Sequence, residues 1–174
     1  MVKLQHISAY EQMYTWAMEQ LKAAFPASER RDDDLQRQVM QHPDYRLCAI
    51  IDGNRPVGVV GYWDTPNFVY FENFCVCSTL RNCGYGSATL KLLTQNLSKP
   101  FILEIELPQD ALTQRRKAFY ERNGMVENPF EHIQPHYRAT DPDLPLMVMT
   151  YKTQISRSEY NVFRKYLDEN VDVR

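Results

Sequence analysis

The stretch TLRNCGYGSATLKLL, residues 79–93, places two glycines between an apolar run and a segment with helical apolar spacing. Glycine disfavours both helices and strands, so Gly84 and Gly86 indicate a special backbone requirement at this point. The preceding residues 68–77, FVYFENFCVC, are typical of a strand. A strand that passes through a glycine turn into a helix presents free backbone amides to an anion, and Arg81 can add a charged contact. The stretch therefore predicts a phosphate-binding turn.

Three classes of phosphate-containing ligand compete for this turn. A P-loop requires Gly-Lys-Ser/Thr, but Gly86 is followed by Ser87 and Ala88, with no lysine. A dinucleotide-binding turn requires a third glycine, where this chain has Thr89, although Glu104 falls where a ribose-binding acid would lie. That fold also opens with its glycine turn, whereas a run of antiparallel strands is expected before it here. Coenzyme A is the third class, and a turn without any ligand is the structural alternative.

The hydrophobic pattern along the rest of the chain predicts a mixed α/β fold. Strands are expected over residues 2–7, 68–78, 101–107, 125–138 and 144–152, with two more in 45–63 around the hairpin signal Asp52-Gly53-Asn54. Helices are expected over residues 13–25, 33–42, 85–98, 111–124 and 157–170. The order is β-α-α-β-β-β-α-β-α-β-β with an extra C-terminal helix. The crossover through the helix after the glycine turn should make its two flanking strands parallel.

Composition limits the class of protein further. The 174 residues are enough for one domain with a substantial core. The net charge of −2 argues against a nucleic-acid-binding protein driven by a global positive field. No apolar run approaches the ~18 residues of a membrane helix, and the N-terminal residues lack the apolar region of a signal peptide. The four cysteines lack the spacing of a zinc site, so we expect reduced structural thiols, no metal and a cytoplasmic location.

Two motifs and the strand order together resemble one enzyme family. Arg-x-x-Gly-x-Gly at 81–86 resembles the pyrophosphate-binding motif of the GNAT acetyltransferase superfamily, and FYERNGM at 119–125 resembles its helix-to-strand signature. The expected order of strands and helices is that of the same family. The resemblance covers about residues 1–152, so it implies a GNAT domain there and a helical extension over 153–174. It also implies the acyl-CoA N-acyltransferase fold, with acetyl-CoA as the co-substrate.

The resemblance assigns contacts with the co-substrate to a strand, the glycine turn and a later helix. The strand backbone would pair with the pantetheine arm, and the turn would bind the diphosphate. These residues are Phe74, Cys75 and Val76 in the strand, and Arg81, Asn82, Cys83, Gly84, Tyr85, Gly86 and Ser87 in the turn. A backbone amide near Phe74 or Cys75 would polarise the acetyl carbonyl. Thr113 stands where many members carry a CoA-contacting asparagine, so this contact departs from the family pattern.

Catalytic roles are expected for Tyr120 and Glu72. Tyr120 matches the family's general acid, and a phenol with a pKa of about 10 can protonate a departing thiolate. The alternative for Tyr120 is an aromatic packing role beside Phe119. Strand alternation places Glu72 on the same face as Phe74 and Val76, so it would point into the same cleft. The resemblance implies that such a glutamate acts as the base, usually through a water molecule.

Three further glutamates are candidates for binding the acceptor. Glu104 and Glu106 share one face of the expected strand FILEIEL, and two carboxylates on a central strand are costly to bury without a purpose. Both could bind a cationic substrate, and salt bridges to Arg115 or Arg116 are the alternative. Glu29 lies in a polar segment expected to cover the substrate side, where simple solvation is the alternative.

Together these residues predict an N-acetyltransferase that moves an acetyl group from acetyl-CoA to a primary amine of a small molecule or peptide. Direct attack in a ternary complex is expected, because no histidine adjoins the cysteines in a pattern that would support an acyl-cysteine. The alternative is a non-catalytic, CoA-binding regulatory or interaction module that keeps the fold. The terminal helix could pack on its own domain or on a second subunit, so a homodimer stays open.

Overall fold

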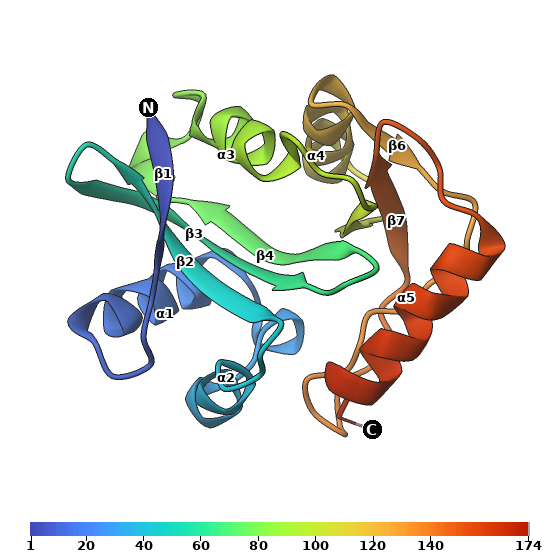
Figure 1. Cartoon of the computed structure of the whole chain (residues 1–174), viewed down its shortest axis with the longest axis horizontal. Coiled ribbons are helices and arrows are strands. Elements are labelled where there is room, and N and C mark those ends of the chain that lie inside the picture. Colours follow the sequence, from blue (N-terminus) through green and yellow to red (C-terminus); the bar gives the residue numbers. More distant parts are fainter. Residues whose placement is uncertain (174) are drawn as a thin grey trace.

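A seven-stranded mixed sheet, in the order β1-β2-β3-β4-β5-β7-β6, forms the centre of the computed structural model, which describes residues 1–173 (Figure 1). The strands are β1 (Val2–His6), β2 (Tyr45–Asp52), β3 (Arg55–Asp64), β4 (Val69–Val76), β5 (Phe101–Glu106), β6 (Met125–Glu127) and β7 (Leu146–Tyr151). The helices are α1 (Gln12–Ala24), α2 (Asp33–Val39), α3 (Tyr85–Thr94), α4 (Ala111–Arg122) and α5 (Arg157–Asn170). This is the predicted order, and β4 and β5 are parallel as expected. Within residues 1–173, no helix combines the length and apolar character needed to cross a membrane.

The expected strand over 125–138 is wrong beyond its first residues. β6 comprises Met125–Glu127 only, and the segment that follows is irregular apart from one isolated bridge. Pro129 and Pro135 lie in this segment, and neither has the amide hydrogen that a strand ladder requires. The segment instead supplies side chains to the pocket described below.

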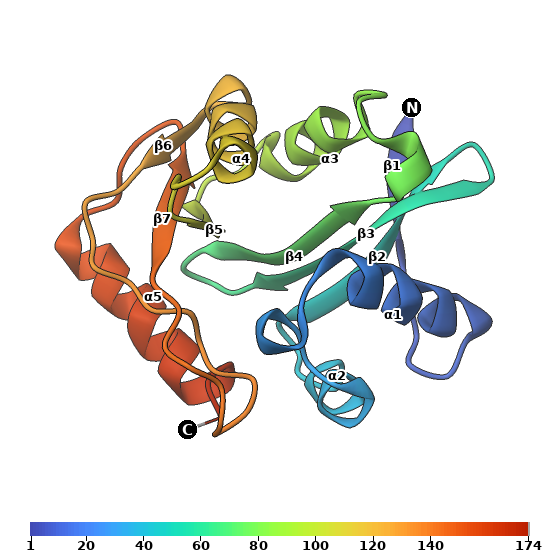
Figure 2. The same ribbon diagram turned by 180° about the vertical axis from the view of Figure 1, so that it is seen from behind.

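Helices cover both faces of the sheet, and each face has its own core (Figures 1 and 2). On one face, α1 and α5 bury residues such as Met18, Leu21 and Phe163. On the other face, α3 and α4 bury residues such as Leu90 and Tyr120. The terminal helix α5 therefore packs on its own domain. The proposed division of the chain after residue 152 stays a prediction, because α5 shares the core of the preceding elements.

β4 and β5 separate after a short paired region. Val69–Phe71 pairs with Phe101–Leu103, and the pairing between these strands ends there. From Glu72 on β4 and from Glu104 on β5 the sheet opens, and we call this gap the strand opening. β4 still pairs with β3 as far as Val76, which keeps the free edge of β4 extended.

A β-bulge in β4 changes which side chains face each side of the strand opening. The register between β3 and β4 shifts at Gly61, and Glu72 is the extra residue on β4. Glu72 contacts Arg31 from the α1–α2 connection, whereas Phe74 packs in the core of the α3–α4 face. The expected shared face for Glu72 and Phe74 is therefore wrong, because the bulge interrupts the alternation on which it was based.

Candidate active site

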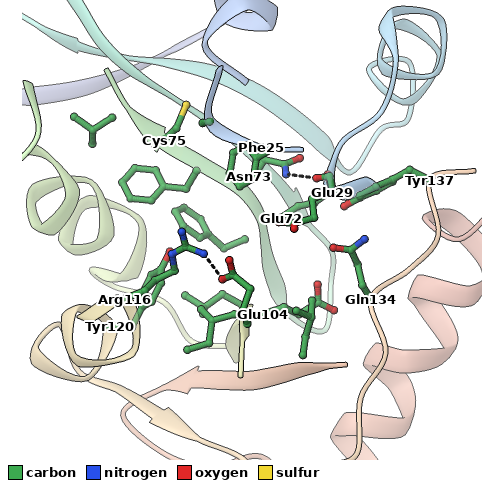
Figure 3. Close-up of a pocket in the computed structure, with 18 of the residues that line it drawn as sticks. Phe25, Glu29, Glu72, Asn73, Cys75, Glu104, Arg116, Tyr120, Gln134 and Tyr137 are labelled. Atoms are coloured by element: carbon green, nitrogen blue, oxygen red, sulfur yellow. Dashed lines mark hydrogen bonds and ion pairs between the residues drawn. The ribbon is translucent and has the colours of Figure 1, made fainter. Parts of the chain in front are cut away.

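A pocket of about 210 Å³ lies at the strand opening (Figure 3). The predicted site residues that line it are Glu29, Glu72, Phe74, Cys75, Val76, Arg81, Glu104, Glu106 and Tyr120. Figure 3 shows Tyr120 and Arg116 across the pocket from Gln134 and Tyr137, with Glu104 between them. Tyr120 belongs to the core of the α3–α4 face and Tyr137 to the core of the opposite face. The pocket therefore joins the two faces of the sheet.

Gly84 and Gly86 meet two different backbone requirements. Gly84 is the N-cap of α3 and has a φ of +81°, a left-handed conformation that strains residues with a Cβ. A Cβ at Gly86 would lie 2.9 Å from Cζ of Phe119 on α4. The structure thus gives Gly86 a packing role between α3 and α4 that the sequence did not predict. Its contact with a phosphate stays a prediction.

The turn offers features that fit a diphosphate. No side chain caps the N-terminus of α3, so its first amides stay available to a ligand. Arg81 lines the pocket and forms no ion pair within residues 1–173. Asn82 also has a positive φ of 64°, a left-handed conformation in which asparagine is enriched. An anionic group at this turn would meet backbone donors and one unneutralised guanidinium.

The remaining residues predicted to contact the co-substrate do not line the pocket; they are Asn82, Cys83, Gly84, Tyr85, Gly86, Ser87 and Thr113. The hydroxyl of Tyr85 donates to Oδ2 of Asp52 at 3.0 Å, which turns this side chain toward the β2–β3 hairpin. Thr113 forms a capping box with Asp110 at the start of α4. The hydroxyl of Thr113 therefore has a structural partner, and the Asp110-x-x-Thr113 spacing could have indicated it.

The free edge of β4 runs through Phe74, Cys75 and Val76. All three residues line the pocket, and β5 does not pair with this part of the strand. Burial raises the pKa of the Cys75 thiol to about 12. A thiol that stays protonated at neutral pH is a poor nucleophile, which disfavours an acyl-cysteine at this position.

Tyr120 reaches the pocket from the last turns of α4. Burial raises the pKa of its phenol to about 12, although the nearby Arg116 acts in the opposite direction. Within residues 1–173, no group hydrogen-bonds the Tyr120 hydroxyl. A phenol that keeps its proton and has no protein partner is suited to donate that proton to a leaving group.

Glu72 forms a buried, bidentate ion pair with Arg31, a residue that the sequence analysis missed. Nη1 and Nη2 of Arg31 donate to the two carboxylate oxygens of Glu72 at 2.8 Å each. The side chains are 5% and 0% exposed, and Tyr137 donates to the same carboxylate at 3.2 Å. Burial lowers the pKa of Arg31, but Glu72 more than compensates and keeps the guanidinium charged. Because donors already occupy both oxygens, this geometry argues against the predicted role of Glu72 as the base.

Glu106 lies at the α4 side of the pocket, and Glu29 enters the pocket from the α1–α2 connection. Glu106 forms an ion pair with Arg116, which is the salt bridge that the sequence left open as an alternative. Glu29 is half-buried, and burial together with the charge of Glu106 raises the pKa of its carboxyl, while Arg116 lowers it. No hydrogen bond to the Glu29 side chain forms within residues 1–173. Glu29 is therefore free to contact a ligand.

Glu104 has hydroxyl and imidazole partners instead of a guanidinium. The Tyr70 hydroxyl donates to Oε2 of Glu104 at 2.6 Å, and Nε2 of His132 contacts Oε1. Burial and the charge of Glu104 raise the pKa of Tyr70 well above its usual range, so this phenol remains a donor. Sequence reasoning missed His132, because it lies in the irregular segment that was expected to be a strand.

Side-chain hydrogen bonds join the irregular segment to the α1–α2 connection. Nε2 of Gln134 donates to the carbonyl of Ser28 at 2.8 Å, and Nη1 of Arg138 donates to the carbonyl of Ala27 at 2.5 Å. Together these segments form the wall of the pocket that faces away from α3 and α4, and we call it the distal wall. No periodic signal in the sequence predicts this pairing.

The site as a whole defines a class of protein: an acyltransferase that uses an acyl-CoA. A strand edge freed by a split sheet, followed directly by a glycine turn at a helix N-terminus, provides backbone donors for an extended arm and for a diphosphate. The model of the acetyltransferase (GNAT) family matches residues 10–125. Because this match covers well over half of the chain, the protein belongs to the GNAT family, whose enzymes use acetyl-CoA. Family membership favours an enzyme over the non-catalytic module.

Solved structures agree with this assignment. A Bacteroides thetaiotaomicron protein assigned to the GNAT family is 32% identical, with a TM-score of 0.90 and coverage of 97% of both chains. An aminoglycoside 6'-N-acetyltransferase in complex with coenzyme A is 16% identical, with a TM-score of 0.62 over 85% of this chain and 95% of that one. An Elizabethkingia anophelis acetyltransferase with bound acetyl-CoA is 11% identical, with a TM-score of 0.57 over 87% and 98%. The last two show the fold alone. No curated protein sequence matches the chain significantly.

Proposed function

We propose that this acetyltransferase moves the acetyl group of acetyl-CoA to a primary amine of a small molecule or peptide, by direct attack in a ternary complex. The strand opening is the observation that carries the proposal. It links the α3–α4 face, from which Tyr120 enters the pocket, to the distal wall, where Glu29 lies. A co-substrate and an acceptor that enter from opposite faces can meet without an enzyme-bound intermediate.

The co-substrate would lie along the α3–α4 side of the strand opening. The uncapped amides of α3 and the guanidinium of Arg81 support diphosphate binding there. The free edge of β4 from Phe74 to Val76 supports pairing with the pantetheine arm, as a strand would pair. A backbone amide on this edge would polarise the acetyl carbonyl.

Acetyl transfer then needs one nucleophilic attack and one proton donation to sulfur. The lone pair of the amine attacks the carbonyl carbon, the C–N bond forms and the C–S bond breaks. Tyr120 donates its hydroxyl proton to the departing thiolate, in keeping with a pKa raised to about 12 by burial. The attacking nitrogen loses one proton as the amide forms, and this proton restores the Tyr120 phenol.

A positively charged acceptor fits the distal side of the pocket. Glu72 and Glu106 are neutralised by Arg31 and Arg116, but Glu29 has no arginine partner of its own and faces the pocket. A cationic amine would stabilise its carboxylate. The free thiols of all four cysteines support the cytoplasm as the proposed location. The expected lack of nucleic-acid binding and the possible homodimer stay predictions.

The test is a thiol-release assay with a panel of acceptors. The full chain is incubated with acetyl-CoA and primary amines, including diamines, aminoglycosides and peptides, and a thiol-reactive dye reports free CoA. Fully N-methylated forms of the same amines are the matched controls, since they cannot form a stable amide. We expect release with at least one primary amine and none with its methylated form. If acetyl-CoA raises the melting temperature while no amine gives release, the proposed transfer is refuted.

A further inference from the structure

We propose that Glu29, Asn73 and Gln134 bind a second ammonium group of the acceptor, one that does not react, so that the enzyme prefers small diamines. We call these three residues the ammonium site. The inference rests on the proposed function and narrows its acceptor from any primary amine to a molecule with two amino groups. The sequence analysis identified neither Asn73 nor Gln134 as a candidate.

Two amide side chains present oxygen atoms that have no donor. Asn73 and Gln134 are 5% and 8% exposed, and both line the pocket. Within residues 1–173, neither side-chain oxygen accepts a hydrogen bond. Both oxygens remain accessible, since Nε1 of Trp63 is the one fully enclosed side-chain atom without a partner in this part of the chain. Buried amide oxygens normally have a donor, so a ligand with N–H groups would supply what the protein does not.

Backbone carbonyls determine which atom of each amide is left for a ligand. Nδ2 of Asn73 donates to the carbonyl of Glu29 at 3.4 Å, and Nε2 of Gln134 donates to the carbonyl of Ser28 at 2.8 Å. Exchanging nitrogen and oxygen in either amide would place two acceptors against each other. The oxygens therefore point away from these carbonyls. Figure 3 shows the oxygen of Gln134 turned toward the centre of the pocket and its nitrogen turned away.

The same hydrogen bonds hold Glu29 beside the two amides. Glu29 ends the short turn Ala27–Glu29 of the α1–α2 connection, and Arg138 donates to the carbonyl of Ala27 at 2.5 Å. The turn is thus bonded to β4 and to the irregular segment at once. Burial raises the pKa of the Glu29 carboxyl, so its charged form lacks the stabilisation that a cationic ligand would supply. The three oxygen-bearing groups are positioned before a ligand arrives, which lowers the entropy cost of binding.

The chemistry of the ammonium site fits the amine that does not attack. A primary ammonium has three N–H donors for the two amide oxygens and the carboxylate. These acceptors favour its charged form, and a charged ammonium has no lone pair with which to attack a carbonyl. The reacting nitrogen must therefore lie elsewhere. Tyr120, the proposed proton donor to sulfur, lies across the pocket from Gln134 (Figure 3). An acceptor that reaches both ends needs two amino groups.

The rest of the pocket suits a short methylene chain between the two amino groups. Apolar side chains, among them Phe25, Phe71 and Leu103, also line the pocket. They would remove a hydrocarbon linker from water. The pocket volume of about 210 Å³ favours a small acceptor.

The first experiment compares linear α,ω-diamines with amino alcohols of the same chain length. Thiol release by the full chain gives kcat/KM for each compound. A hydroxyl is uncharged and has one proton to donate, so it leaves oxygens of the ammonium site unpaired. We expect the best diamine to exceed its amino alcohol by roughly 10-fold or more, the effect of about one charge-assisted hydrogen bond. Equal values at every chain length overturn the ammonium site, while the proposed acetyl transfer stands.

Variants of the ammonium site should change this preference more than they change the activity itself. Glu29→Gln should abolish most of the preference for the diamine, and Asn73→Ser and Gln134→Met should each reduce it. Gln134→Met also removes the bond to Ser28, so the readout is the ratio of the two kcat/KM values. A merely structural role would lower both values and leave their ratio unchanged. An unchanged ratio in all three variants overturns the assignment.

Two matched controls lie outside the pocket. Glu19→Gln removes a carboxylate from the exposed side of α1. Gln154→Met removes an amide whose Nε2 also donates to a backbone carbonyl, that of Glu127, at 2.9 Å. We expect both to keep the ratio of the wild type. A loss of preference in these controls as large as that in Glu29→Gln contradicts a local site.

Calorimetry with CoA-saturated protein tests the ammonium site without turnover. We expect the wild type to bind the diamine roughly 10-fold or more tightly than the amino alcohol, and Glu29→Gln to bind both alike. Equal affinities in the wild type overturn the ammonium site. If the wild type shows the expected difference but turns over no amine, the proposed transfer is refuted and the ammonium site stands as a binding site.

Discussion

Replacing Arg31 by methionine should destabilise the protein strongly, because it leaves the Glu72 carboxylate buried without its partner. The pair is bidentate, with two donor–acceptor distances of 2.8 Å and side-chain exposures of 5% and 0%. Breaking a buried ion pair from one side costs about 3–5 kcal/mol. The guanidinium also lies 4.8 Å from the ring centroid of Tyr137, so further stacking energy is lost. For a chain of this length, the melting temperature should fall by about 6–20 °C.

Urea unfolding followed by tryptophan fluorescence measures the change in free energy. Arg115→Met is the matched control, because Arg115 is exposed and bonds only to a backbone carbonyl in its own helix. It should stay within about 0.5 kcal/mol of the wild type. The double variant Arg31→Met with Glu72→Leu should be more stable than Arg31→Met alone, since the orphaned charge is gone. If Arg31→Met costs less than about 1 kcal/mol, or if the double variant is the least stable, the reasoning is refuted.

Three further predictions concern the co-substrate side of the pocket. Tyr120→Phe should lower kcat roughly 100-fold without changing acetyl-CoA affinity by calorimetry, and kcat of the wild type should stay level to pH 10 because burial raises the phenol pKa to about 12. A wild-type kcat in Tyr120→Phe contradicts the acid role. Gly86→Ala should destabilise the fold by about 1–3 kcal/mol, since the new Cβ meets Phe119, and adding Phe119→Leu should recover part of that loss in urea unfolding. Arg81→Gln should weaken acetyl-CoA binding roughly 10-fold or more, in line with about 1.5–3 kcal/mol for a charged hydrogen bond. Acetyl-pantetheine lacks the diphosphate, so Arg81→Gln should bind it as tightly as the wild type does. An equal loss of affinity for acetyl-CoA and for acetyl-pantetheine would contradict diphosphate binding at the glycine turn.

Local pattern was enough to predict most of the fold. The hairpin, the parallel crossover and the helices all leave short-range signals, and the glycine turn identified the strand next to the opening. The prediction from strand alternation was wrong at Glu72, because this extra residue at a bulge places the side chains that follow it on the opposite face of β4 from the one expected. It failed again after β6, where Pro129 and Pro135 outweighed the apolar pattern.

The candidate site was predictable only where it follows one continuous segment. Tyr120 and Arg81 could be identified because each belongs to a local motif. Arg31 could not, because its partner lies 41 residues away in the chain and neither residue signals the other. The contact of His132 with Glu104 could not be predicted for the same reason, because 28 residues separate the two in the chain. Contacts that depend on which distant segments meet are set by tertiary packing and leave no trace in periodicity.

The distal wall has an evolutionary consequence. The side of the pocket assigned to the co-substrate comes from one unbroken run, from β4 through α4, whereas the distal wall combines two loops that Gln134 and Arg138 tie to the backbone of Ser28 and Ala27. A new acceptor preference can therefore arise by changing these loops without disturbing the run that supports the acetyl donor. Because the loops bond to each other, such changes should occur in both at once, and an exchange of acceptor specificity between relatives should require the two loops to be transplanted as a pair.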